Sequence, residues 1–183
     1  MSAVRSVALV AGTLLAGSWA LGQVPGPDEL RDRPFERPGA MGQVVQLRTG
    51  GLRVDHASLG HELVDTDGTR LPTTGVWLLV EYRFERSGEA GTSSGATVVD
   101  LAGRIFSATG SGCEVAQPAI PRACTLAFEL PAGTTGRGLA LRFPAGVTER
   151  ADDVAVIQLP ELPGAVATVV LLPPHQLTAE ELE

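Results

Sequence analysis

Lysine is missing from this chain of 183 residues, in which all 14 basic side chains are arginine. The 21 acidic residues outnumber them, so the formal net charge is −7. Nucleic acids and anionic lipid surfaces are bound through concentrated basic patches, and the charge balance therefore argues against both as partners. Alanine, glycine, valine and leucine dominate the sequence. Together with the absence of lysine, this composition is typical of a GC-rich genome rather than of a particular function.

Aromatic residues make up only 4% of the chain, whereas 22 glycines and 13 prolines interrupt it. Between Gln43 and Pro173 no segment has a convincing helical period. These shortages argue against a long-helix architecture and favour short strands separated by turns. About 140 residues remain after an N-terminal segment and a linker, which is enough for one domain with a hydrophobic core and too few for two.

Charge is also missing from the start of the chain, where no charged side chain occurs between Arg5 and Asp28. A basic start, an apolar run and small residues at its end predict a secretion signal or a signal-anchor helix in residues 1–22. A bilayer core needs about 20 apolar residues, and residues 6–27 reach that length, although Gly12, Gly17, Ser18 and Gly22 dilute them. We expect a single-pass membrane anchor with the folded part outside. Cleavage before Gln23, which gives a secreted protein, is the alternative.

A linker follows the apolar run. Residues 23–43 contain four prolines among alternating acids and arginines, a composition that buries too little apolar surface to fold alone. This pattern predicts a stalk between the membrane and a domain at residues 44–173. Residues 174–183 are expected to form a tail, either solvated or ending in a short helical turn capped by Thr178.

From residue 44 onward the chain alternates between short strands and turn residues. Residues 44–48 and 52–56 are predicted to pair as a hairpin around a Thr-Gly-Gly turn. The clearest strand is residues 76–84, which is apolar on one face throughout and on the other for its first half. Such a strand belongs in the middle of a packed sheet. About eight or nine strands at this spacing predict an all-β, immunoglobulin-like antiparallel β-sandwich, with a partly open barrel as the second choice.

Three segments resemble a known kind of domain: residues 75–82, residues 99–106 with their Asp-Leu-Ala-Gly turn, and the Ala-Phe-Glu-Leu-Pro of residues 127–131. They are similar to the telokin-like, immunoglobulin-fold domains of unknown function found on many exported bacterial proteins. The resemblance covers about residues 44–159 and consists of β-sandwich features rather than a chemical signature. It implies an extracytoplasmic accessory or binding module and implies no catalytic residues.

The only two cysteines are Cys113, in a glycine- and serine-rich loop, and Cys124, at the start of a predicted strand. In an oxidising compartment two cysteines that close a short loop favour a disulfide, which contributes about 2–3 kcal/mol of stability. The alternative is two separate thiols, one of them buried. The spacing does not suit a redox dithiol or a metal pair.

A few other residues suggest chemistry. The turn at residues 65–68 begins like a calcium loop, but its later acidic ligand is missing, which favours a plain turn. His56 and His61 are candidates to join Asp65 and Asp67 in binding a metal, although two histidines without a clear third ligand are usually surface residues. The sequence contains no Gly-x-Ser-x-Gly elbow.

Two functions from different classes follow. The first is a non-enzymatic, membrane-anchored or secreted module that binds another envelope protein, such as a transporter subunit, without catalytic residues, cofactor or metal. The second is a small secreted enzyme or metal-binding protein that uses His56, His61, Asp65 and Asp67. The sequence favours the first, because its loops are glycine-rich and largely uncharged.

Overall fold

A computed structural model describes residues 34–87, 95–109, 112–113, 118–145 and 153–178. The chain divides into two compact units, Met1–Arg33 and Pro34–Glu183, and every described residue belongs to the second. The helix predicted for residues 1–22 therefore lies outside the described residues, as do residues 179–183 of the predicted C-terminal turn. Within the part of the chain that the structure describes, no helix is long and apolar enough to cross a membrane.

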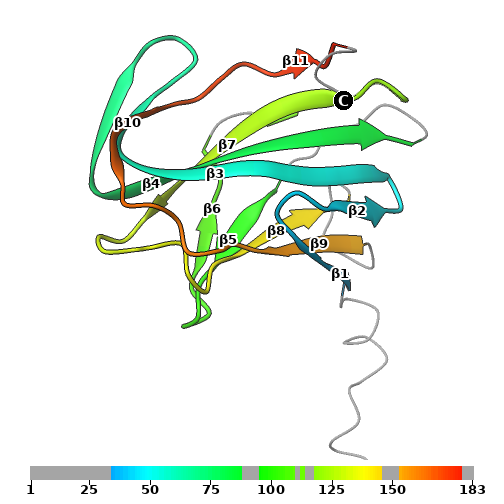
Figure 1. Ribbon diagram of the computed structural model, residues 1–183, viewed down its shortest axis with the longest axis horizontal. Coiled ribbons are helices and arrows are strands. Elements are labelled where there is room, and N and C mark those ends of the chain that lie inside the picture. Colours follow the sequence, from blue (N-terminus) through cyan, green and yellow to red (C-terminus); the bar gives the residue numbers. More distant parts are fainter. Residues whose placement is uncertain (1–33, 88–94, 110–111, 114–117, 146–152, 179–183) are drawn as a thin grey trace, which may run out of the picture. The chain divides into compact units, whose positions relative to one another are not determined.

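In the described residues, eleven strands form two sheets that pack as a β-sandwich (Figure 1). The strand order is β1-β9-β8-β5-β6 in the first sheet and β10-β3-β4-β7-β11 in the second, where β2 also pairs with β3. The strands are β1 (Phe35–Ala40), β2 (Val44–Leu47), β3 (Gly50–Val64), β4 (Arg70–Arg86), β5 (Thr97–Val99), β6 (Ile105–Ser107), β7 (Arg122–Leu130), β8 (Ala140–Pro144), β9 (Asp153–Gln158), β10 (Val166–Val170) and β11 (His175–Gln176).

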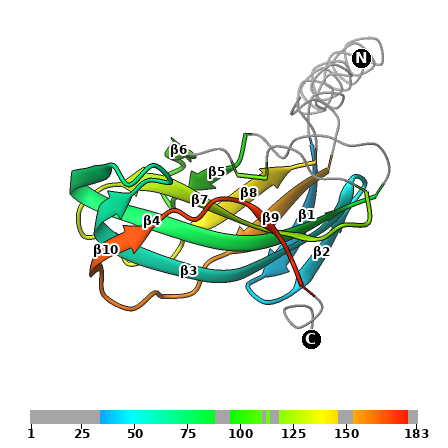
Figure 2. The same ribbon diagram turned by 90° about the horizontal axis from the view of Figure 1, so that it is seen from above.

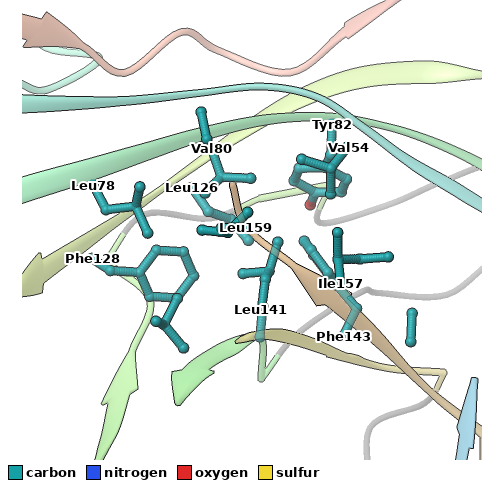
Figure 3. Packing of buried hydrophobic residues seen from close by; sticks show 14 of the residues in the cluster. Val54, Leu78, Val80, Tyr82, Leu126, Phe128, Leu141, Phe143, Ile157 and Leu159 are labelled. Atoms are coloured by element: carbon teal, nitrogen blue, oxygen red, sulfur yellow. The ribbon is translucent and has the colours of Figure 1, made fainter. Parts of the chain in front are cut away.

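The core lies between the two sheets. It includes one face of β4, on which every second side chain from Val76 to Phe84 is apolar. One face of β4 carries the five apolar side chains predicted from the sequence, all of them buried: Val76, Leu78, Val80, Tyr82 and Phe84. Figure 3 shows Val80 and Tyr82 opposite Leu141 and Ile157 of the first sheet. Full burial of one such side chain stabilises the fold by about 1.5–3 kcal/mol. The prediction that this strand lies inside a sheet is confirmed, since β4 pairs with both β3 and β7.

The predicted sandwich is confirmed, but its pairing is not purely antiparallel. Strand β1 pairs in parallel with β9, and β10 pairs in parallel with β3. Each parallel pair joins segments about a hundred residues apart in the chain. Alternation along a strand indicates which side chains face the core, but it carries no information about the direction of a distant neighbour. For this reason the sequence did not reveal the two parallel pairs.

The structure also differs from the linker predicted at residues 23–43. Its last part forms β1, in which backbone pairing runs from Phe35↔Asp153 to Ala40↔Gln158. Most of the β1 side chains are exposed, so the composition resembles that of a linker. The strand is held instead by its backbone and by ion pairs, including Arg37 Nη2 to Asp153 Oδ1 at 3.4 Å. Pro38 is tolerated because β1 is an edge strand.

Residues 166–176, the C-terminal strap, run from β10 across the outer face of the second sheet to β11 (Figure 2). Val169 and Leu171 of the strap form a second apolar cluster with three buried side chains of that face, Trp77, Leu79 and Ala127. The strap is also pinned by the Thr125 hydroxyl, which donates to the carbonyl of Leu172 at 2.8 Å and accepts from its amide at 3.1 Å. The predicted tail thus begins as a paired strand.

Candidate interaction site

The two cysteines are joined by a disulfide bond in the structure, with their Cα atoms 5.6 Å apart. Both side chains are buried in the main core. Cys124 pairs across the strands with Tyr82, whose hydroxyl oxygen accepts a hydrogen bond from the Cys113 amide at 2.9 Å. The predicted pair therefore attaches the loop before β7 to the centre of the sandwich. A disulfide that closes a short loop stabilises the fold.

The four residues of the metal hypothesis are not brought together. His56 and His61 are exposed side chains on the same strand, β3, five residues and hence about 16 Å apart along it. Among the described residues, no three histidine, cysteine or acidic side chains lie close enough to hold a metal ion. Asp65 and Asp67 stabilise the turn in which they lie: their carboxylates accept hydrogen bonds from the backbone amides of Thr66 and Thr69, respectively. The Thr69 amide also holds the pKa of Asp67 below its usual value.

A cavity of about 200 Å³ lies beside the strap, and its lining includes Asp55, Glu81, Arg83 and His175. Asp55 faces this space but is bound on both sides, by Arg53 Nε at 2.6 Å and Arg83 Nε at 2.7 Å. The carboxylate therefore joins neighbouring strands, a role that requires no ligand.

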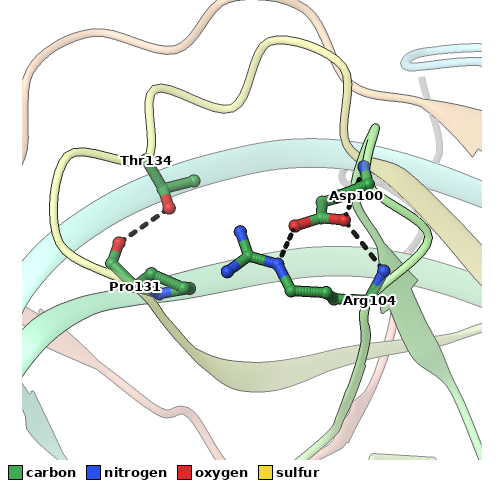
Figure 4. A network of polar contacts seen from close by, with 5 residues as sticks. Asp100, Arg104, Pro131 and Thr134 are labelled. Atoms are coloured by element: carbon green, nitrogen blue, oxygen red, sulfur yellow. Dashed lines mark hydrogen bonds and ion pairs between the residues drawn. The ribbon is translucent and has the colours of Figure 1, made fainter.

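The turn between β5 and β6 is built around the side chain of Asp100 (Figure 4). One oxygen, Oδ1, accepts from the amides of Ala102 and Arg104, each at 2.9 Å. The other, Oδ2, accepts from Arg104 Nε at 2.6 Å. The amide of Arg104, followed by its guanidinium, holds the pKa of Asp100 below its ordinary value of 3.8. An aspartate at the first position of a turn is favoured because it binds the following amides in this way.

A cavity of about 290 Å³, here called the Arg104 cavity, separates this turn from the loop at residues 131–139. Its lining includes two arginines, Arg104 and Arg137, and one acid, Asp100. Apolar walls come from Phe106 and Leu139, and the guanidinium carbon of Arg104 lies 5.8 Å from the centre of the Phe106 ring. A cation over an aromatic face is attracted by the ring and is oriented by it.

Apolar side chains are exposed at the same corner of the sandwich. Leu101, in the turn, is 87% exposed, and Ile105, in β6, is 68% exposed. In the described residues β6 is the last strand of its sheet and is hydrogen-bonded to β5 on one side. Two residues after β6, Thr109 exchanges two backbone hydrogen bonds with Ala127 of β7, at 2.7 and 3.2 Å, so the edge without a partner strand is limited to β6 itself. An open strand edge beside exposed apolar side chains is a surface that another chain can extend or cover.

Sequence reasoning predicted the tight turn at residues 100–103 but did not recognise this cavity. The spacing of Asp100 and Arg104 in the sequence could have indicated part of the site, because it suits a turn closed by a side chain. Arg137 gives no comparable signal, because it follows β7 and is brought to the same cavity as Arg104 only through the pairing of β8 with β5.

No protein-family model matches the sequence, and no curated protein matches it. A crystal structure of an uncharacterized beta-sandwich protein from Clostridium difficile 630 has a similar fold, with a TM-score of 0.48 and 10% sequence identity. The similarity covers 73% of this chain and 99% of that chain.

Proposed function

We propose that this protein is a non-enzymatic interaction module of the bacterial envelope, of the telokin-like, immunoglobulin-fold kind. Residues 1–22 either anchor it in the membrane, with the folded unit outside, or direct its secretion before they are cleaved. Its partner is another envelope protein, such as a transporter subunit. The module contributes a binding surface and needs no cofactor.

Two features support a location outside the cytoplasm. The apolar run near the N-terminus is typical of an export signal or signal anchor. The Cys113–Cys124 disulfide is buried in the core, and structural disulfides persist mainly in oxidising compartments.

The observation that carries the proposed interaction is the pair of exposed apolar side chains Leu101 and Ile105, at the open edge formed by β6. Clustered exposed apolar side chains are a feature of protein-binding surfaces. On the outer side of β6, where the described residues contain no further strand, they accompany backbone groups that a partner strand can satisfy. A corner that combines both features is suited to binding an extended segment.

Site-specific photocrosslinking in the native host tests this proposal. A photoreactive amino acid is placed at Ile105 in the full chain and, as a matched control, at Val44, an equally exposed apolar residue of the other sheet (64% against 68%). We expect a discrete protein adduct from position 105 that is absent from position 44. The same adducts at both positions, or none at position 105, would contradict an interaction at this edge.

A further inference from the structure

The charge of the Arg104 cavity is opposite to that of the chain. Acids exceed arginines by 21 to 14 in the whole sequence, yet two arginines and a single acid line this cavity. Asp100 carries one negative charge, which is paired with Arg104 through Oδ2, so the positive charge of Arg137 is not balanced by an acid of the lining. The lining therefore carries an excess positive charge.

Each of the two guanidinium groups has N–H donors that form no hydrogen bond with the described residues. Arg104 uses Nε for Asp100, and its two terminal nitrogens point away from that carboxylate, toward Pro131 and Thr134 (Figure 4). Its side chain is 61% exposed. Arg137 is exposed as well and makes no ion pair within the part of the chain that the structure describes. An arginine presents several donors in one plane, a geometry that matches a carboxylate.

Both walls of the cavity are fixed before any ligand binds. The Asp100 side chain closes one wall, and the side chain of Leu101 covers Gly138, where a Cβ atom would lie 2.5 Å from it. In the other wall, the amide of Leu162 donates to the carbonyl of Thr135 at 2.9 Å, and the Thr134 hydroxyl donates to the carbonyl of Pro131 at 2.7 Å. A site formed in advance loses little conformational entropy on binding.

We propose that the Arg104 cavity binds a carboxylate side chain of an extended, acidic partner segment that lies along β6, with an apolar neighbour of that carboxylate packed on Leu101 and Ile105. This inference rests on the proposed function, since it names the chemistry of the partner at the same corner. Exposed apolar side chains beside the cations favour a peptide over a free inorganic anion, which would use the arginines alone. The outer edge of β6, which pairs with no other strand among the described residues, supplies the backbone groups that hold an extended segment.

Arginine substitutions in the full-length protein that carries the photoreactive residue at position 105 test whether binding of the partner requires the positive charges. Arg137→Gln is the main variant, because Arg137 makes no ion pair with any described residue, and its loss therefore leaves the contacts of the turn in place. Arg104→Gln is the second variant, and Arg70→Gln is the control: Arg70 is an exposed arginine of β4 (70% against 61% for Arg104) that does not line the cavity and is paired with Glu62. We expect about a tenfold lower yield of the position-105 adduct in R137Q and R104Q, as loss of one charge-assisted hydrogen bond predicts, and no change in R70Q.

Adduct yields that stay unchanged in R137Q and R104Q would overturn the acidic-segment inference while leaving the interaction module in place. A loss of adducts in all three variants, R70Q included, would also overturn it, because the effect would then be independent of this cavity. Absence of an adduct from the unsubstituted chain is the separate outcome that contradicts the proposed function itself.

A binding measurement on the purified full chain in detergent micelles distinguishes an acidic peptide from an uncharged peptide and from a free anion. The probes are a synthetic peptide of alternating glutamate and valine, its glutamine counterpart, and inorganic phosphate, each followed by the NMR signals of the Arg104 and Arg137 side chains. We expect the glutamate peptide to shift both signals and the other two probes to bind at least about tenfold more weakly. Equal effects of the glutamate and glutamine peptides, or a stronger effect of phosphate, would overturn the proposal.

Discussion

The hydroxyl oxygen of Tyr82 accepts a hydrogen bond from the backbone amide of Cys113 at 2.9 Å, inside the main core. Tyr82 is also paired across the strands with Cys124, the other half of the disulfide. One buried side chain of the central strand β4 thus contacts both ends of the disulfide-closed loop. The loop is therefore coupled to the packing of the sandwich.

Replacing Tyr82 with phenylalanine removes this acceptor while keeping the ring. We expect the free energy of unfolding to fall by about 1–3 kcal/mol, the cost of leaving a buried donor without that partner. Urea denaturation measures the change. In a C113S/C124S background the same substitution should cost clearly less, because the loop is no longer held against the ring. Equal costs in both backgrounds would show that the two contacts are independent.

Removal of the disulfide should destabilise the fold without abolishing it. The two cysteines are 11 residues apart, and a loop of that size predicts a loss of about 2–3 kcal/mol in the C113S/C124S variant. Denaturant unfolding of this variant, and of the unsubstituted chain with and without a reductant, gives the value. The unsubstituted chain under reducing conditions should unfold at nearly the same denaturant concentration as the variant. A variant as stable as the oxidised protein would contradict a structural role for the bond.

The C-terminal strap should loosen when its hydrogen bonds to Thr125 are removed. Thr125→Val keeps the shape of the side chain but deletes the bonds to both backbone groups of Leu172. We expect faster hydrogen exchange in residues 166–176 and little change in β4, measured by mass spectrometry. Thr168→Val is the control, since the hydroxyl of Thr168 makes only a long contact of 3.4 Å with Glu62. Identical exchange in the two variants would refute the anchoring role of Thr125.

Acid should open the turn between β5 and β6. The amide and guanidinium of Arg104 lower the pKa of Asp100 below 3.8, so the carboxylate stabilises the folded turn at all pH values above the unfolded pKa. That contribution is lost as the pH falls through the lower, folded pKa. NMR titration of the Asp100 carboxyl, together with the Ala102 and Arg104 amides, should show one shared midpoint below 3.8. A midpoint at or above this value would contradict the hydrogen bonds seen here.

Much of the sandwich could be predicted because local patterns determine it. The two faces of β4, the hairpin of β2 with β3 and the turn before β6 all depend on residues close together in the sequence. The alternation of Trp77 and Leu79 with the main core residues also indicated that the second face of β4 begins apolar. What covers that face could not be predicted, since Val169 and Leu171 lie some ninety residues away.

The candidate site was harder to predict than the fold, for a related reason. Asp100 and Arg104 are close in sequence, and their turn was expected, but the role of Arg104 depends on what lies opposite. Arg137 belongs to a loop between β7 and β8 and reaches the cavity because β8 pairs with β5. Conversely, His56 and His61 are close in sequence and stay apart, because an extended strand separates them. In both cases the separation of residues in the sequence did not indicate their separation in space.

Export is the claim on which the proposed partner and site depend, and one measurement tests it directly. The protein is recovered from the membrane, culture-medium and cytoplasmic fractions of its native host, alkylated before reduction, and its mass is determined. We predict a species outside the cytoplasm, either full-length in the membrane or starting at Gln23 in the medium, with no thiol that reacts before reduction. A full-length cytoplasmic protein with both Cys113 and Cys124 alkylated would contradict it.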